Sequence, residues 1–419
     1  MIDIAILGYG VVGTGVAEVC RMNQDMIQKR IGEPVNIKKI LDIRDFPGDP
    51  FSDRITHDPD EIFLDPEISV VVETIGGAGI AYQLSQRALL SGKHLVTSNK
   101  ELVATYGPEL MELALENGVS YMFEASVGGG IPIIRPLHKC MSANIVESIT
   151  GILNGTTNFI LTHMEQDNTD FAATLQEAQA RGYAEQNPTT DIEGIDACRK
   201  IAILGSITMG EFIDSRQIYT EGIAGTTGTD LAYARALGAR LKLIGRFHRI
   251  MDNKAELIVA PMLIPQNHPL AVANDVYNAI MVEGNALGEA MFYGRGAGKM
   301  PTASAVVADV IECAMHIHRV PHLLPWIKTD RQIIQPHVSC PVMALVRLKD
   351  DVSVEAVQAV FAPYGIRYVP AQAAGEQAFL TGHEATLTED QLQVSLDTLA
   401  LSVISRIRIL EDLTQIVRK

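Results

Sequence analysis

The sequence predicts an α/β protein that begins with a doubly wound parallel sheet of the Rossmann type. Short apolar segments alternate with amphipathic segments through residues 1–130, which is the pattern of parallel strands joined by helices. A glycine-rich turn follows the first apolar segment, and the pattern changes after that range. We therefore expect a Rossmann domain over residues 1–130, an α+β domain over 131–320, a linker over 321–337 and a small ferredoxin-like domain over 338–419.

The elements of the first domain follow from the spacing of apolar residues. Continuous apolar runs suit parallel strands that are buried on both faces, whereas apolar residues three or four apart suit helices. Strands are expected over residues 4–7, 35–43, 69–75, 94–97 and 119–124. Helices are expected over residues 13–30, 81–91 and 108–116.

The later domains mix strands with longer helices. In the second domain we expect strands over residues 148–153, 256–263 and 279–282, and helices over residues 171–181, 195–209 and 231–237. The third domain has the order strand, helix, strand, strand, helix, strand, which is typical of a ferredoxin-like module. Its clearest elements are strands over residues 342–348 and 378–382 and helices over residues 354–362 and 391–400.

The composition excludes several classes of protein. The net charge of −16 argues against binding to nucleic acid or to an anionic membrane surface. No apolar run is long enough to span a bilayer, and the N-terminus lacks the basic region of a signal peptide. The five cysteines are scattered without metal-binding spacing, so we expect reduced thiols and a cytoplasmic protein.

The segment Gly8-Tyr9-Gly10-Val11-Val12-Gly13 follows the first strand and begins a helix. That context is the one in which such a motif binds a dinucleotide, because the first glycine permits a tight turn and the second lets the backbone approach a pyrophosphate. The third glycine lets the helix pack closely on the sheet, and the N-terminus of that helix attracts the phosphates. The alternative is a strand–helix turn without a ligand.

The end of the second strand carries the residues that would choose between NAD and NADP. An acidic side chain at this position suits the ribose of NAD, whereas an arginine suits the 2′-phosphate of NADP. Asp42 and Arg44 are both present and share a side-chain parity, so both cofactors stay open. Arg44 favours NADP or the use of both, unless it belongs to a solvated loop.

The densest polar grouping lies in the second domain. Asp196 and Lys200 are four residues apart and share one face of an expected helix, and Tyr183, Glu185 and Asp191 precede that helix. Carboxylates around a lysine can hold a substrate ammonium group while the lysine handles a hydroxyl proton. The alternative is a capped helix with a surface ion pair.

Eight segments in order resemble the homoserine dehydrogenase family and span residues 1 to about 320. They are residues 8–13, 73–77, 96–100, 124–132, 151–158, 182–185, 191–200 and 294–303. The resemblance implies an NAD(P)-dependent oxidoreductase acting on a CH–OH group, which interconverts L-homoserine and L-aspartate 4-semialdehyde in threonine, methionine and isoleucine biosynthesis. It also implies that the second domain carries catalysis and dimerisation.

The resemblance assigns roles to particular residues. Lys200 would do the acid–base work, Lys100 would lie near the nicotinamide and the substrate, and Glu185 would contact the substrate amino group. The remaining residues of the substrate pocket would be Asp191, Asp196, Tyr183, Gly155 and Thr156. The cofactor would be bound by Gly8, Tyr9, Gly10, Val11, Val12, Gly13, Arg44, Thr74, Ser98, Lys100 and Gly298.

A second glycine-rich loop resembles a family site for a monovalent cation, Na⁺ or K⁺. Glu124 would supply a side-chain oxygen, and Val127, Gly129 and Ile131 would supply backbone carbonyls. Ligation by oxygen alone suits a hard cation. The alternative is a glycine-rich hinge without a metal.

The C-terminal domain resembles an ACT domain, which implies L-threonine as an effector and a homodimer or homotetramer. Thr381 and His383 stand where the family carries a Thr-His pair. The usual Asp-x-Pro-Gly turn after the first strand is replaced by residues 349–353. The glycine would make room for an effector, so its absence leaves a purely structural or dimerising role open.

Two other functions compete with this interpretation. An aspartate-semialdehyde dehydrogenase needs a cysteine nucleophile with a basic partner. No motif in the sequence marks such a partner for Cys140 or Cys198, and Lys200 fits an alcohol–carbonyl reaction better. A non-catalytic sensor of nucleotides and amino acids has no need of Lys100, Glu185 and Lys200 together. Both alternatives therefore explain less of the sequence than the dehydrogenase does.

Overall fold

The computed structural model describes residues 1–419 apart from residues 252, 318–325, 400–401, 412 and 414–419. Part of the expected linker, residues 321–325, lies outside the described residues, as does the expected end of a helix at residue 400. No helix within the described ranges combines the length and the apolar character needed to cross a bilayer.

The described chain divides into two compact units that are not continuous in sequence. The first unit comprises residues 1–145, 202–215 and 294–330. The second comprises residues 146–201, 216–293 and 331–419. This division differs from consecutive domains, because the chain returns to the first unit after residue 293.

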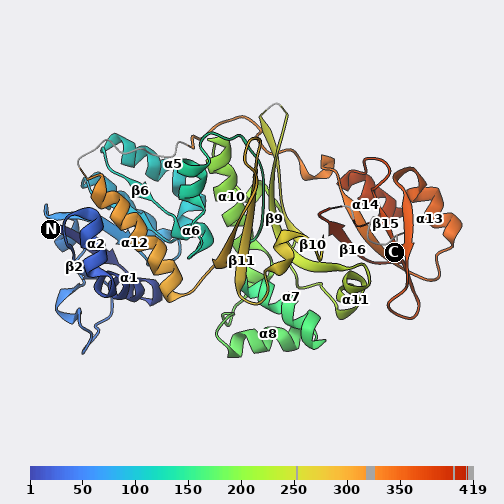
Figure 1. The fold of residues 1–419 in the computed structure, drawn as a ribbon, viewed down its shortest axis with the longest axis horizontal. Coiled ribbons are helices and arrows are strands. Elements are labelled where there is room, and N and C mark those ends of the chain that lie inside the picture. Colours follow the sequence, from blue (N-terminus) through green and yellow to red (C-terminus); the bar gives the residue numbers. More distant parts are fainter. Residues whose placement is uncertain (252, 318–325, 400–401, 412, 414–419) are drawn as a thin grey trace. The chain divides into compact units, whose positions relative to one another are not determined.

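The first unit is built on a parallel sheet, as expected. Its strands lie in the order β3-β2-β1-β4-β5-β6. Figure 1 labels β2 and β6 of this sheet. They are β1 (Ile2–Leu7), β2 (Val35–Leu41), β3 (Ile55–Thr56), β4 (Ile68–Glu73), β5 (His94–Thr97) and β6 (Tyr121–Met122). Side chains of β1 such as Ile4 and Ile6 are fully buried, as a central parallel strand requires. The strand order reverses beside β1, which is where such sheets bind nucleotides.

Helices cover this sheet in two groups. Helices α1, α2 and α12 pack together, and α4 packs against α5. Their bounds are α1 (Val11–Met22), α2 (Gln24–Ile31), α3 (Asp60–Phe63), α4 (Gly79–Leu90), α5 (Lys100–Glu116), α6 (Ala125–Gly128) and α12 (Lys299–Met315). Helix α12 was not predicted, and it lies so close to α1 that a Cβ on Gly15 would be 3.0 Å from Ala303 Cβ.

Two predicted helices of this unit had the wrong bounds. The helix expected over residues 13–30 is broken at Asn23, whose backbone leaves the helical region. The helix expected from Pro108 begins at Lys100, because Asn99 caps it with a side-chain oxygen that accepts the N–H of Leu102. The proline is accommodated inside this helix.

The second unit is built on a mixed sheet. Within the described residues its strands follow the order β12-β11-β7-β9-β10-β16-β13-β15-β14, and β8 pairs with β10. They are β7 (Val146–Ile152), β8 (Tyr219–Thr220), β9 (Ala239–Ile250), β10 (Lys254–Pro265), β11 (Tyr277–Gly284), β12 (Gly288–Arg295), β13 (Met343–Lys349), β14 (Ile366–Val369), β15 (Glu376–Thr381) and β16 (Val403–Ile409). The long β9–β10 hairpin supplies its centre, although the sequence predicted only part of β10.

The helices of this unit agree closely with those expected, apart from α7 and α9, which were not predicted. They are α7 (Gly155–Asp167), α8 (Phe171–Ala180), α9 (Thr189–Ile192), α10 (Ile195–Met209), α11 (Gly228–Ala236), α13 (Val354–Phe361) and α14 (Glu389–Thr398). Asn154 and Asp170 cap α7 and α8 through side-chain oxygens.

The C-terminal module, residues 338–419, has the predicted order strand, helix, strand, strand, helix, strand. Its strands are antiparallel neighbours in the order β16-β13-β15-β14. Val346, Phe361 and Phe379 form part of its buried core. Strand β16 also pairs in parallel with β10, so the module extends the central sheet of the second unit.

Candidate active site

The glycine turn after β1 has the shape that its sequence predicts. Gly8 has a φ of +89°, and a Cβ at Gly13 would lie only 2.1 Å from the carbonyl oxygen of Gly8. Gly10 faces open space and precedes the first residue of α1. The backbone is therefore free to meet a pyrophosphate at the N-terminus of a helix.

Asp42 and Arg44 form an ion pair at the end of β2. Asp42 is buried and accepts the backbone N–H of Tyr9 at 2.7 Å. Both Nε and an Nη of Arg44 lie 3.0 Å from its carboxylate oxygens, and these bonds lower the pKa of Asp42 to about 2. The Arg44 side chain is 58% exposed and lies over the ring of Phe46. Asp42 thus supports the turn, while Arg44 faces solvent.

The other expected cofactor residues of the first unit take different positions. The hydroxyl of Thr74 donates a hydrogen bond to the carbonyl of Gly8 at 2.7 Å, so Thr74 stabilises the turn. Ser98 and Lys100 are half-buried where β5 passes into α5. The sequence did not predict Glu73, a buried carboxylate that accepts the hydroxyl of Thr97 at 2.6 Å. Burial raises the pKa of Glu73.

The carboxylate of Glu124 is an acceptor for backbone groups. It accepts the N–H groups of Ile133, Ile134 and Arg135 at 2.6, 2.8 and 2.7 Å. These three hydrogen bonds hold the chain after the loop. Within the described residues there is no group of three or more His, Cys, Asp or Glu side chains suited to a metal ion.

The rest of the expected cation loop packs against the segment before α12. Gly129 has a φ of +56°, and a Cβ there would be 2.3 Å from the carbonyl of Gly296. Gly130 N–H donates to the Arg295 carbonyl at 3.2 Å. Val127 and Ile131 are buried on either side of these glycines. Glycine is required here by close backbone approach.

The Asp196–Lys200 pair is buried in the second unit. Lys200 Nζ lies 2.8 Å from Asp196 Oδ2, and the two side chains are 8% and 2% exposed. Lys200 also donates to the carbonyl of Leu153 at 2.7 Å, where β7 ends. The alternative of a surface ion pair is therefore wrong, because surrounding structure excludes water from both charges.

Asn154 joins the two carboxylates that the sequence placed near this lysine. Its Nδ2 donates to Asp191 Oδ1 at 2.7 Å and to Asp196 Oδ2 at 2.9 Å. Its Oδ1 accepts the N–H of Thr157 at 2.8 Å and caps α7. Gly155 follows, and a Cβ there would lie 3.0 Å from the carbonyl of Val276. The role of Asn154 was not predicted, although the Asn-Gly-Thr-Thr run is a recognisable helix start.

The segment that carries Tyr183 and Glu185 is more open. Thr156 donates its hydroxyl to the carbonyl of Tyr183 at 2.7 Å, and the Tyr183 ring contacts Phe159. Glu185 is exposed, and no described residue forms a hydrogen bond or ion pair with its carboxylate. The contact of Glu185 with the substrate amino group stays a prediction.

A second buried lysine of this unit was not predicted. Lys242 on β9 is 1% exposed and donates to Asn158 Oδ1 at 2.8 Å and to the Ala273 carbonyl at 2.7 Å. Burial lowers its pKa to about 7. The sequence around Lys242 does not indicate that the lysine is buried, because its hydrogen-bond partners come from distant segments.

A glycine turn at the reversal point of a parallel sheet, together with a water-excluded lysine–carboxylate pair, defines a dinucleotide-dependent oxidoreductase. The comparisons with known proteins narrow this class. The sequence profile of the homoserine dehydrogenase NAD-binding domain matches residues 8–124, and that of homoserine dehydrogenase matches residues 132–311. The chain belongs to the homoserine dehydrogenase family, whose members are oxidoreductases acting on a CH–OH group.

The relatives cover most of the chain. Homoserine dehydrogenase of Neisseria gonorrhoeae is 44% identical over 329 residues, which is 77% of this chain and 75% of the relative. That of Bacillus subtilis is 43% identical over 314 residues, 74% and 72% of the two chains.

Two solved structures extend the comparison. The homoserine dehydrogenase of Thiobacillus denitrificans has a TM-score of 0.90 at 37% identity and covers 98% of both chains. A hyperthermophilic archaeal homoserine dehydrogenase in complex with NADPH has a TM-score of 0.65 at 27% identity, covering 76% of this chain and 99% of that one.

Proposed function

We propose that this chain catalyses the reversible, NAD(P)-dependent interconversion of L-homoserine and L-aspartate 4-semialdehyde. The observation that carries the proposal is the buried Asp196–Lys200 pair, held beside Asp191 by Asn154. Homoserine offers a hydroxyl for a lysine and an ammonium group for carboxylates. In cells this reaction would serve threonine, methionine and isoleucine biosynthesis.

Lys200 takes the hydroxyl proton of homoserine in this mechanism and returns it in the reverse direction. Bound NAD(P), held by the turn from Gly8 to Gly13, would supply the hydride acceptor for the carbon that carries this hydroxyl. Asp196 orients the lysine and balances its charge, since its carboxylate lies 2.8 Å from Nζ. Glu185 and Asp191 hold the substrate ammonium group, and Tyr183, Gly155 and Thr156 line the pocket. Lys100 would be the second catalytic lysine.

The test is NAD(P)H formation from L-homoserine by the full chain and by Lys200→Met. We expect the variant to lose about 10²- to 10⁴-fold in kcat, the range of a general acid–base group. Lys254→Met is the matched control, because Lys254 is an exposed lysine of the same unit. An inactive parent chain defeats the proposed reaction, and an undiminished Lys200→Met defeats the role of Lys200.

For the cofactor we propose that the turn from Gly8 to Gly13 holds the pyrophosphate, with Thr74 supporting it and Ser98 and Gly298 completing the site. Arg44 would hold a 2′-phosphate, so NADP would be used at least as well as NAD. The exposure of its guanidinium supports this role. The carboxylate of Asp42 could accept a hydrogen bond from the ribose of NAD, so NAD is not excluded.

We further propose a monovalent cation, Na⁺ or K⁺, at the loop from Glu124 to Ile131. The donor set fits, because it consists of oxygen atoms alone, with backbone carbonyls from Val127, Gly129 and Ile131. Glu124 can add a lone pair while it accepts three N–H groups. Replacing K⁺ and Na⁺ by tetramethylammonium at constant ionic strength should lower activity and thermal stability together, whereas unchanged values would remove the cation from the proposal.

The C-terminal module we propose to be an ACT domain that responds to L-threonine in a homodimer or homotetramer. Its element order and strand order support an ACT-like fold. Titration of L-threonine into the full chain, followed by initial rates and by sedimentation, tests both parts. Initial rates that do not change with L-threonine would contradict the regulatory role. A sedimentation mass equal to that of one chain would contradict the homodimer or homotetramer.

A further inference from the structure

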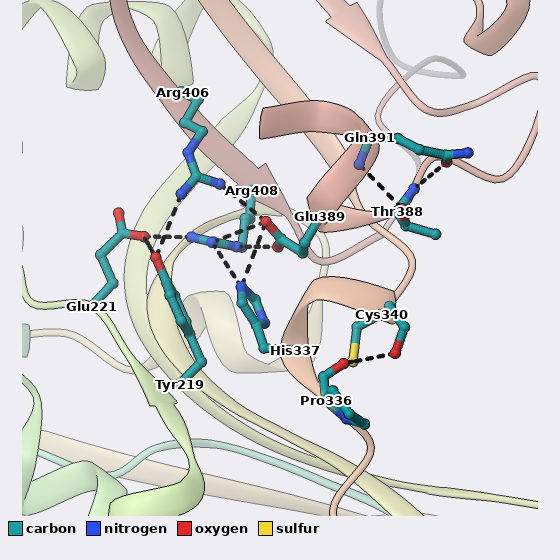
Figure 2. Close-up of polar contacts among 11 residues, drawn as sticks. Tyr219, Glu221, Pro336, His337, Cys340, Thr388, Glu389, Gln391, Arg406 and Arg408 are labelled. Atoms are coloured by element: carbon teal, nitrogen blue, oxygen red, sulfur yellow. Dashed lines mark hydrogen bonds and ion pairs between the residues drawn. The ribbon is translucent and has the colours of Figure 1, made fainter. Parts of the chain in front are cut away.

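A cluster of charged side chains joins the C-terminal module to residues 219–223 (Figure 2). Its centre is Arg408 on β16, whose side chain is 4% exposed. The Nε and Nη2 groups of Arg408 donate to the two carboxylate oxygens of Glu389 at 2.6 and 3.2 Å. Its Nη1 group donates to Glu221 Oε2 at 2.5 Å. Because Glu389 belongs to the module and binds the guanidinium through two bonds, the module presents Nη1 to Glu221 in a fixed direction.

Tyr219 strengthens the same connection. Its hydroxyl donates to Glu221 Oε2 at 3.0 Å and accepts from Arg406 Nη2 at 3.4 Å. Its ring stacks on the imidazole of His337, with the ring centroids 3.7 Å apart. The carboxylate of Glu221 therefore has two donors, and side chains from the C-terminal part of the chain hold both of them in place (Figure 2).

Backbone pairing holds only the beginning of this segment. Strand β8 pairs with β10 through two residues, and Glu221 N–H donates to the carbonyl of Val259 at 2.8 Å. No strand of the described chain includes residues 222 and 223. The side chain of Glu221 is therefore the last fixed point of the segment before these two residues.

Residues 222 and 223 pack against the turn that leads into α10. Ile223 N–H donates to the carbonyl of Ile192 at 2.8 Å. A Cβ at Gly222 would lie only 2.2 Å from the same carbonyl oxygen, so the two backbones are in direct contact. Contact at this distance means that one segment cannot shift without moving the other.

Gly194 makes the second contact between these segments. It has a φ of +79°, and a Cβ there would lie 3.5 Å from the carbonyl oxygen of Glu221. Its N–H donates to the carbonyl of Asp191 at 3.0 Å, and its own carbonyl accepts the N–H of Cys198 in the first turn of α10. The turn thus lies between Asp191 on one side and the helix that carries Lys200 on the other.

We propose that Glu221 is a positioning residue for the substrate site, and that Arg408 of the C-terminal module holds Glu221 in place. The module would then fix the distance between Asp191 and Lys200 through permanent contacts, without a ligand of its own. This inference rests on the proposed function, because it concerns the site for homoserine. The alternative is that the pairing of β8 with β10 fixes the segment by itself, in which case the ion pair contributes stability alone.

Steady-state kinetics of the full chain with L-homoserine and NADP test the proposal. Glu221→Ala should raise the KM for L-homoserine about tenfold, because Asp191 shifts relative to Lys200 and small displacements are costly at a reacting centre. The KM for NADP should stay unchanged, since the glycine turn belongs to the other unit. Glu221→Gln keeps an oxygen for both donors and should restore most of the loss. An unchanged KM for L-homoserine in Glu221→Ala, or an equal rise in both KM values, overturns the proposal.

Glu376→Ala is the matched control. Glu376 also pairs with a buried arginine of the module, because its carboxylate lies 2.7 Å from Arg347. Arg347 in turn bonds to Asp230 of α11, outside residues 219–223. The variant should lower Tm and leave the KM for L-homoserine unchanged. A rise in KM as large as that of Glu221→Ala would show a general loosening of the module and would overturn the specific role of Glu221.

A double-variant cycle tests the part assigned to Arg408. Arg408→Leu should raise the KM for L-homoserine as Glu221→Ala does, and the double variant should raise it no further, because both substitutions remove one contact. Where Arg408→Leu does not fold, Arg408→Lys gives the same comparison, since a single ammonium group cannot reproduce the fork of bonds to two carboxylates. Effects on KM that multiply in the double variant overturn the role of Arg408.

Hydrogen exchange separates this inference from the proposed function. A chain that does not oxidise L-homoserine contradicts the proposed function, whereas the exchange of backbone amides in residues 191–198 can be followed by mass spectrometry in either case. Glu221→Ala should speed this exchange several-fold, because the turn loses its support, and Glu376→Ala should not. Equal exchange in Glu221→Ala and the parent chain overturns the positioning role.

Discussion

Lys200 and Lys242 are both buried lysines of the second unit, 6% and 1% exposed, yet their surroundings differ. Lys200 has an ion-pair partner, because the carboxylate of Asp196 lies 2.8 Å from its Nζ. Lys242 is held by a side-chain amide and a carbonyl, no described carboxylate lies within ion-pair distance, and its pKa falls to about 7. Two lysines that are buried to a similar degree therefore differ in the kind of partner that holds the amine.

The comparison of Lys200 with Lys242 predicts that the largest change in the free energy of unfolding comes from replacing Asp196, the partner of Lys200. Asp196→Asn removes the charge that compensates a buried ammonium group, so we expect a loss of roughly 3–5 kcal/mol in the free energy of unfolding. Urea unfolding of the variant and its parent measures this loss. The double variant Asp196→Asn with Lys200→Met should recover part of the lost stability. If the effects of the two substitutions on the free energy of unfolding simply add, the two residues do not interact and the ion pair is contradicted.

A second prediction concerns the stability of the chain against pH. The unfolded chain keeps a proton on Lys242 up to its ordinary pKa of 10.5, whereas the folded chain loses it above about 7. Between these values the unfolded state binds more protons, so this lysine makes the free energy of unfolding rise with pH. That contribution is absent below pH 7, where both states are protonated.

Lys242→Met should remove this rise. Relative to the parent, the variant should lose about 1.4 kcal/mol of stability for each pH unit above 7, as measured by urea unfolding at several pH values. Lys254→Met, at an exposed position, serves as the control and should run parallel to the parent. Parallel curves for Lys242→Met would show that Lys242 keeps its proton in the folded chain.

Asn154 is the next test, because it holds both carboxylates near Lys200. Asn154→Ala removes a helix cap and two charge-assisted hydrogen bonds, so we expect a loss of about 2 kcal/mol in stability. The KM for homoserine should rise as well, since Asp191 loses its anchor. Asp170→Ala, which removes only the cap of α8, should cost about 1 kcal/mol and leave KM unchanged. Equal KM values for the two variants would contradict the positioning role of Asn154.

The smallest effect is expected at Arg44, which is the exposed member of its ion pair with Asp42. Arg44→Ala should raise the KM for NADPH by about tenfold and that for NADH much less, because only NADPH carries the 2′-phosphate. The stability of the first unit should change by less than about 1 kcal/mol, because Arg44 is exposed and Asp42 keeps the backbone N–H of Tyr9 as a donor. Initial rates with the two cofactors measure the difference, and equal increases would remove Arg44 from the choice of cofactor.

The residues that could be predicted from the sequence are those with local signals. The glycine turn lies in one short segment, and Asp196 and Lys200 are one helical turn apart, so spacing alone placed them together. Strand β5 was predicted with its observed bounds for the same reason, as a short apolar run between polar residues.

The residues that could not be predicted depend on distant parts of the chain. Lys242 and Arg246 sit in one strand, and their surroundings are set by α7 and by the C-terminal module. The return of α12 to the first unit is likewise a property of packing, because helix propensity does not say which sheet a helix covers. The break between α1 and α2 at Asn23 could not be predicted either, because no proline or glycine marks it.

The pairing of β16 with β10 also bears on how this enzyme can be engineered. Met262 and Leu263 of β10 pair with Arg408 and Ile409, so an internal strand of the sheet is shielded by the end of the chain. A shortened chain that stops near residue 330 would leave the Met262–Leu263 end of β10 unpaired, and an unpaired strand edge is a template for aggregation. Deletion of the module would thus mix its effect on activity with an effect on solubility, and point variants separate the two.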